Sequence, residues 1–164
     1  MLILSQRQQE VFDKNFLIPK AKYMGGNNNT TITVENTVKG PVEKVWKFWT
    51  KPEHIKKWNN ASADWHTPHA ENDLKVGGKF VSRMEAKDGS VGFDFGGVYD
   101  EVTLNESIAY TLADGRKVKI IFSGQGNETK VVETFEAENT NSIEMQKGGW
   151  QAILDNFKKY TEEN

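Results

Sequence analysis

With 164 residues, the chain is long enough for one compact domain and too short for two domains with separate cores. Its hydrophobic content of 37% and charged content of 27% are typical of a water-soluble globular protein, and a formal charge of −2 argues against nucleic acid as a partner. The lack of cysteine excludes disulfides, thiol nucleophiles and thiolate metal sites, and it fits a reducing cytoplasm.

The first residues differ in character from the rest of the chain. In MLILSQRQQEVF, Arg7 and Glu10 interrupt the apolar residues before a signal peptide or a membrane span could form, so we expect a cytoplasmic protein without membrane insertion. The stretch MGGNNNT is typical of a flexible connection. We therefore interpret 1–29 as an N-terminal extension, either flexible or carrying a short partner-binding helix, and 30–164 as the domain.

The domain is expected to begin with a β-strand. The segment TTITVENTV starts at Thr30 and alternates Ile32 and Val34 with threonine and glutamate. Alternation with a period of two and a high content of β-branched residues favour a strand that is buried on one face.

Two short helices are predicted next. GPVEKVWKFWT has apolar residues at positions i, i+3, i+4 and i+7, and Pro41 is placed at the first helical position. PEHIKKW begins a second helix at Pro52, with Ile55 and Trp58 on one face. The tryptophans gathered in this region are expected to be packing groups of a helical corner.

After Trp58 the sequence predicts an antiparallel meander. Asp88-Gly89 and Asp114-Gly115 are strong signals for tight hairpin turns between neighbouring strands. The expected strands are SADWHT, KFVSRMEA, FDFGGVYDEVT, SIAYTLA, KVKIIFSG and TKVVETFEAE.

The longest helix is predicted at the C-terminus, from about Asn141 to Glu162. Gly148 and Gly149 lie inside it and each costs about 1 kcal/mol relative to alanine, which suggests close backbone approach or space for a ligand at that point. Its apolar stripe comprises Ile143, Trp150, Ile153, Leu154, Phe157 and Tyr160. An amphipathic helix must cover a sheet face, so the fold class is α+β.

Motifs for catalysis or metal binding are weak. The stretch DWHTPHAEND contains His66 and His69, but the intervening Thr-Pro favours an extended or turn conformation over a helical turn that aims both imidazoles at one ion. We interpret it as a solvated loop. No nucleophile elbow, P-loop or dinucleotide-binding pattern occurs, so we assign no catalytic residue, no metal and no cofactor.

Four segments carry a resemblance to a known family. They are PVEKVWKFWTKPEHIKKW, DLKVGGKF, FGGVYDEV and GGWQAILDNFKKY, in this order along the chain. Together with the order of the predicted elements, they resemble the START-like (SRPBCC) superfamily and, within it, the proteins homologous to the C-terminal domain of the activator of the heat-shock-protein-90 ATPase. The resemblance implies a helix-grip fold, in which a curved antiparallel sheet wraps around the C-terminal helix.

The resemblance also implies an elongated apolar cavity between the sheet and that helix. Candidate lining residues are Phe80, Ser82, Met84, Phe93, Phe95, Tyr110, Val118, Ile120, Phe122, Trp150, Ile153, Leu154 and Phe157. Ser82, Arg83, Tyr110 and Glu133 are candidates for polar groups that orient a ligand, although strand alternation points Arg83 outward. The alternative is that the apolar residues simply fill a solid core.

Three functions follow from this reading. The first is non-enzymatic binding of an apolar, aromatic or lipid-like small molecule. The second is a co-chaperone-like interaction module with a chaperone partner and a role in the stress response, as the family name implies. The third is a cyclase or hydrolase that uses the cavity, which requires a polar constellation deep inside it.

Overall fold

The computed structural model describes residues 30–164, and the extension that we interpret at 1–29 lies outside this part. In chain order the described elements are β1 (Thr31–Lys39), α2 (Val42–Thr50), α3 (Pro52–Trp58), β2 (Trp65–Asn72), β3 (Lys79–Ala86), β4 (Gly92–Thr103), β5 (Ser107–Leu112), β6 (Lys117–Gln125), β7 (Glu128–Glu136) and α4 (Ile143–Glu163). None of the helices in residues 30–164 has the length and apolar composition of a membrane span.

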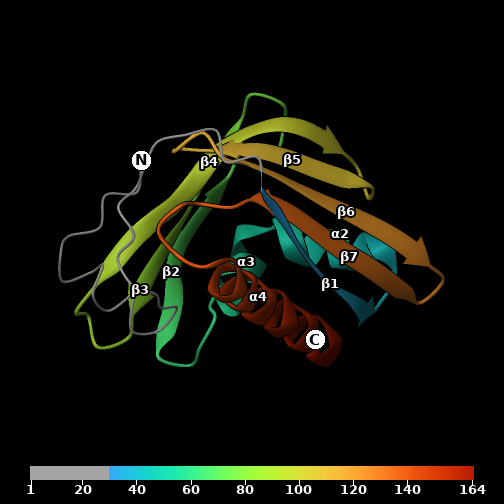
Figure 1. Ribbon diagram of the computed structural model, residues 1–164. Helices are drawn as coiled ribbons and strands as arrows, with labels where there is room; N and C mark the ends of the chain where they lie inside the picture. Colours follow the sequence, from blue (N-terminus) through green and yellow to red (C-terminus); the bar gives the residue numbers. More distant parts are fainter. Residues whose placement is uncertain (1–29) are drawn as a thin grey trace.

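The strands form one antiparallel seven-stranded sheet in the order β1-β7-β6-β5-β4-β3-β2. Figure 1 shows this sheet curling around α4, with α2 and α3 beside the helix. Helix α4 packs most closely against β1 and also contacts α3. The α+β helix-grip architecture predicted from the sequence is therefore confirmed.

The predicted hairpin turns connect β3 to β4 and β5 to β6. Gly89 and Gly115 have φ angles of 75° and 92°, a region that glycine enters without steric cost. The preceding aspartates accept backbone N–H groups: Asp88 from Ser90 at 2.8 Å and Asp114 from Arg116 at 3.1 Å. These local bonds explain why Asp-Gly pairs predict the meander so well.

The glycine pair in β4 allows neighbouring backbones to approach closely. A side chain on Gly96 would overlap the carbonyl oxygen of Phe80, and one on Gly97 would overlap that of Thr111. A register shift follows between Tyr99 and Glu101. Such irregularities bend a sheet, which is what wrapping around a helix requires.

The two short helices form the corner that their sequence predicts, with one small difference. Pro52 is the first residue of α3, but Pro41 precedes α2 as its N-cap, one position earlier than predicted. The buried Trp58 donates from Nε1 to the carbonyl of Phe48 at 2.9 Å. Its ring lies 4.9 Å from that of Phe157 on α4, so this aromatic cluster closes one end of the sheet–helix interface.

Helix α4 begins at Ile143, two residues later than predicted, where the Ser142 hydroxyl accepts the N–H of Met145 at 3.4 Å. Leu154 and Phe157 are fully buried, whereas Ile143 at the start of the predicted stripe is exposed. Gly148 is exposed, and a side chain there would meet no atom of the described residues within 4 Å. The expectation of close backbone approach is therefore wrong at Gly148, while space for a ligand there stays a prediction.

Candidate functional site

The residues predicted to line a cavity lie on the sheet face toward α4, or on the face of α4 that meets the sheet. The strand members are Phe80, Ser82, Met84, Phe93, Phe95, Tyr110, Val118, Ile120 and Phe122, and the helix members are Trp150, Ile153, Leu154 and Phe157. The structure thus brings them together on the two facing layers of the fold.

Closure of this interface differs between its two ends. Near α2 and α3 it is solid, because Phe157 packs edge-on against Trp49 and Trp58 at ring-centroid distances of 4.8 and 4.9 Å. Near β3, β4 and the first half of α4, Met84 is buried, but several other inward-pointing apolar side chains remain half-buried: Phe80, Phe93, Phe95, Trp150 and Ile153. The second end is therefore the less completely closed part of the interior.

Trp150 joins the helix to the sheet at this end. Its indole stacks on the ring of Phe135 with centroids 3.9 Å apart and planes 11° apart, and it meets the edge of Phe95 at 6.1 Å. Aromatic pairs in these geometries hold flat surfaces at defined positions. Phe135 was not among the predicted residues, although the alternation of TKVVETFE places it on the same face as Val131.

An aromatic group on three neighbouring strands forms the adjoining wall. The ring of Phe80 lies 4.7 Å from Tyr110 and 5.1 Å from Tyr99. The Tyr99 hydroxyl donates to Asn72 at 2.5 Å, and Asn72 donates to the carbonyl of Thr50 at 2.7 Å. Tyr99 is thus tied to the protein, and its burial raises its pKa.

Among residues 30–164, Glu133 is the one buried acidic residue, with only 4% of its surface exposed, and it lies on the inner face. It lies on β7 and pairs in register with Val34 of β1 and Ile120 of β6. Burial raises the pKa of Glu133 to about 8, and no hydrogen bond within residues 30–164 opposes that shift. The buried Tyr110 hydroxyl is close enough for the charge of Glu133 to contribute, after burial itself, to a raised pKa of Tyr110.

The two other polar candidates from the sequence, Arg83 and Ser82, lie on opposite faces of β3. Arg83 donates from Nε to Glu85 at 2.9 Å and lies 3.5 Å from Asp94, so the outward direction expected from strand alternation is confirmed. Ser82 is buried on the inner face of β3, between the inward positions of Phe80 and Met84.

The histidine-containing segment is a strand and not the predicted loop. His66 and His69 lie in β2 on either side of a register irregularity, because the extended conformation favoured before proline also suits an edge strand. They approach different carboxylates, His66 near Glu85 at 3.8 Å and His69 near Glu71 at 2.8 Å. Within residues 30–164 no group of three or more potential ligands is arranged to hold a metal ion.

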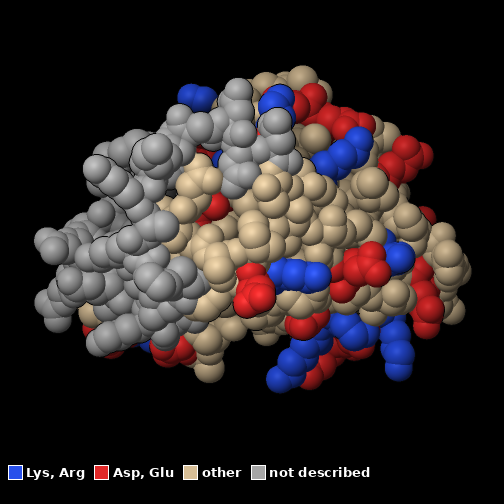
Figure 2. All heavy atoms as spheres, viewed as in Figure 1, with Lys and Arg blue, Asp and Glu red and all other residues tan. Residues whose placement is uncertain are grey.

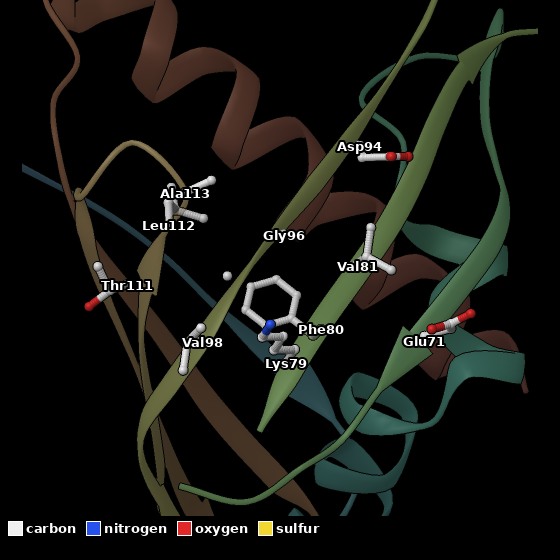
Figure 3. Close-up of a pocket in the computed structure, with 11 residues that line it drawn as sticks. Glu71, Lys79, Phe80, Val81, Asp94, Gly96, Val98, Thr111, Leu112 and Ala113 are labelled. Atoms are coloured by element: carbon white, nitrogen blue, oxygen red, sulfur yellow. The ribbon is translucent and has the colours of Figure 1, made fainter. Parts of the chain in front are cut away.

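A hollow lies on the outer face of the sheet, away from α4. Figure 3 shows Lys79, Val98 and Thr111 around it, with α4 behind the strands. It has a volume of about 700 Å³ and forms where the side-chain-free Gly96 and Gly97 leave Phe80 accessible from outside. Of the predicted lining residues, Phe80 is the one that also borders this hollow.

The face of the protein shown in Figure 2 has no large basic patch that would attract a polyanion such as nucleic acid. Basic and acidic side chains are interspersed there, and the middle of the visible face is uncharged. Elsewhere among the described residues, surface charges pair locally, as in the ion pairs Lys158–Glu162 at 2.6 Å and Lys130–Glu35 at 3.4 Å. Surface pairs of this kind contribute little net stability.

Comparison with known proteins identifies relatives of the whole described domain. The family model described as "Activator of Hsp90 ATPase homolog 1-like protein" matches residues 39–162. The solution structure of an AHSA1-like protein from Aeromonas hydrophila is 43% identical, with a TM-score of 0.78, and covers 82% of this chain and 93% of its own. A solution structure from Cytophaga hutchinsonii is 58% identical, with a TM-score of 0.71 and the same coverage. No curated protein matches the sequence.

Proposed function

The chain belongs to the activator of Hsp90 ATPase homolog 1-like family, whose fold has a hydrophobic cavity, and from this premise we propose that it binds an apolar small molecule without transforming it. The ligand lies between the inner face of β3–β5 and the first half of α4. Aromatic and lipid-like molecules fit the chemistry of the surrounding side chains.

One observation carries this proposal, the incomplete closure of the interior at one end. Inward-facing apolar side chains are normally driven to full burial, because each buried Å² of apolar surface contributes about 25 cal/mol. Phe95, Trp150 and Ile153 point inward yet stay half-buried, whereas Leu154 one position further along α4 is fully buried. A bound apolar molecule would remove the remaining exposed surface of the first three from water.

The energetic scale is adequate for measurable binding. Covering about 300 Å² of apolar ligand surface provides on the order of 7 kcal/mol before ordering costs are subtracted. Micromolar affinity is therefore compatible with a site of this kind.

Calorimetric titration with N-phenyl-1-naphthylamine tests the proposal, supported by the fluorescence increase of this compound in apolar surroundings. Ile153→Trp places a larger side chain between α4 and β3–β4, where the ligand is proposed to lie, and should reduce the affinity at least tenfold. The matched control Ile121→Trp places the same side chain on the exposed outer face of β6 and should leave affinity unchanged. Absence of saturable binding to the wild-type protein, or equal binding by both variants, would contradict the proposal.

A catalytic role is a second candidate, and the buried carboxyl of Glu133 is the observation that favours it. Enzyme sites often contain carboxyls with raised pKa values. Here the neighbouring titratable group is Tyr110, whose pKa is itself raised by burial, and His66 lies near Glu85 away from the interior. Glu133 and Tyr110 can orient a ligand by hydrogen bonding alone, whereas acid–base catalysis would also require proton transfer to or from the ligand. Mass spectrometry of the recovered ligand distinguishes the two roles, because an enzyme would return a chemically changed ligand.

A co-chaperone role is favoured by the family's own name. An activator changes the rate at which the chaperone hydrolyses ATP, whereas a protein that only binds a small molecule does not. An ATPase assay with the cognate chaperone, run with and without an excess of this protein, distinguishes them. A change in turnover that survives Ile153→Trp would place the activity outside the interior site.

A further inference from the structure

Glu133 occupies a position that physical chemistry disfavours for a carboxyl group. Its partners in register, Val34 and Ile120, are each 1% exposed, and its same-face neighbours along β7, Val131 and Phe135, are buried as completely. Glutamate is almost never buried to this degree unless it is paired. Within residues 30–164 it forms no hydrogen bond or ion pair. The residue is therefore suited to pair with something that is not part of this domain.

The surroundings of Glu133 indicate the shape of such a partner. Two residues further along β7, Phe135 carries the stacked indole of Trp150, so flat aromatic surface borders the carboxyl on the side of α4. On the side of the sheet stands Tyr110, itself in contact with the ring of Phe80. A planar apolar molecule is the ligand type that such walls accommodate best.

The protonation state of Glu133 indicates the polar chemistry of the partner. Because burial raises its pKa to about 8, the carboxyl is mostly neutral at neutral pH and can donate one hydrogen bond while accepting another. A hydroxyl group has the same dual capacity and needs no charge to be buried. An ammonium group would instead require the ionised carboxylate.

We propose that Glu133 orients the ligand of this protein, and that this ligand is an aromatic molecule bearing a hydroxyl group that hydrogen-bonds to the Glu133 carboxyl. The inference rests on the proposed function, since it assigns a polar contact within the same interior site. Tyr110 stands next to that contact and offers its own hydroxyl to the same polar end of the ligand.

Matched probes test the assignment. 2-Naphthol and 2-methylnaphthalene share a ring system and differ by a hydroxyl in place of a methyl group. Isothermal titration of each into the wild-type protein, Glu133→Leu and Glu133→Gln gives the ratio of the two affinities for each protein. Comparing this ratio between the proteins cancels the different tendencies of the two probes to leave water. Relative to Glu133→Leu, the wild-type ratio should favour 2-naphthol by roughly 3- to 10-fold, the contribution of one hydrogen bond.

The two variants separate hydrogen bonding from charge. Glu133→Gln keeps a group that donates and accepts, so it should retain most of the preference for 2-naphthol. Glu133→Leu should bind 2-methylnaphthalene as the wild type does, which also shows that the site is intact. Thermal unfolding confirms that both variants fold, and an apolar residue at this apolar position is expected to be tolerated.

The outcomes distinguish failure of this inference from failure of the proposed function. If the wild type and Glu133→Leu bind both probes with the same ratio, Glu133 does not orient the ligand, although the interior site stands. If 1-naphthylmethylamine binds most tightly and Glu133→Gln abolishes that binding, the group recognises a cation and the hydroxyl assignment is overturned. If no probe binds to the wild type, the proposed function fails and this inference fails with it.

Discussion

At the scale of single residues, the burial of Glu133 has a direct thermodynamic consequence. Its pKa is raised from 4.5 to about 8 in the folded protein. Between these values the folded protein holds a proton that the unfolded chain has released, so the free energy of unfolding must fall as the pH rises. The slope from this one group is about 1.4 kcal/mol per pH unit, and the stabilisation present below about pH 4.5 is lost by about pH 8.

Replacing Glu133 by glutamine should remove this dependence. Urea unfolding at about pH 5, 6.5 and 8 is expected to show a smaller decline in Glu133→Gln than in the wild type, with the largest difference at the highest pH. Glu128→Gln, at an exposed position of the same strand, serves as the control and should follow the wild type. Parallel pH profiles for all three proteins would show that Glu133 is not desolvated in solution.

The hydrogen bond of Trp58 accounts for part of the stability of the helical corner. Trp58→Phe keeps a ring near Phe157 but leaves the carbonyl of Phe48 without its donor. We expect a loss of about 1–3 kcal/mol in the free energy of unfolding. Trp49→Phe, at a half-buried position, should cost less. Chemical denaturation measures both, and an equal or larger loss in Trp49→Phe would contradict this assignment.

At the scale of the elements, the glycines of α4 and β4 have opposite roles. Gly148 faces open space within a helix, so Gly148→Ala should stabilise the protein by about 1 kcal/mol. Gly97→Ala places a methyl group against the carbonyl of Thr111 and should destabilise the protein strongly. Thermal unfolding of the two variants checks the contrast. A stabilised Gly97→Ala would mean that β4 and β5 are not so close in solution.

Most elements could be predicted from the sequence because periodicity and turn residues act locally. The helical spacing around Trp46 and the Asp88-Gly89 turn gave the right type of structure at the right place. Strand β2 was missed beyond Thr67, since Pro68 was interpreted as part of a loop, whereas proline in an edge strand need not donate to a neighbour.

The sequence predicts less of the candidate site than of the fold. Tyr110 and Glu133, named from the sequence as candidate polar groups, are buried on the inner face, and Phe80 lies there half-buried. The isolation of Glu133 among Val34 and Ile120 depends on the register across β1, β7 and β6, and register is set by tertiary pairing that one sequence does not reveal. The half-buried state of Trp150 likewise depends on how closely two layers approach.

At the scale of the whole molecule, the sheet separates two possible binding places. The interior is bounded by α4 and offers aromatic walls with one carboxyl, whereas the outer hollow over Gly96 and Gly97 is rimmed by Lys79 and Asp94. An apolar ligand gains more from the interior, because burial of its surface drives binding. A small molecule is therefore expected on the α4 side of the sheet, and not in the outer hollow.

The most direct test is a two-dimensional ¹H–¹⁵N NMR titration with 2-naphthol that follows the tryptophan side-chain N–H signals. The Trp150 signal is identified by its loss in Trp150→Phe. Binding in the interior should shift this signal saturably while the backbone amides of Val98 and Thr111, on the outer face, stay in place. Shifts confined to Val98, Thr111 and their neighbours, or no saturable shift at Trp150, would contradict a ligand site between the sheet and α4.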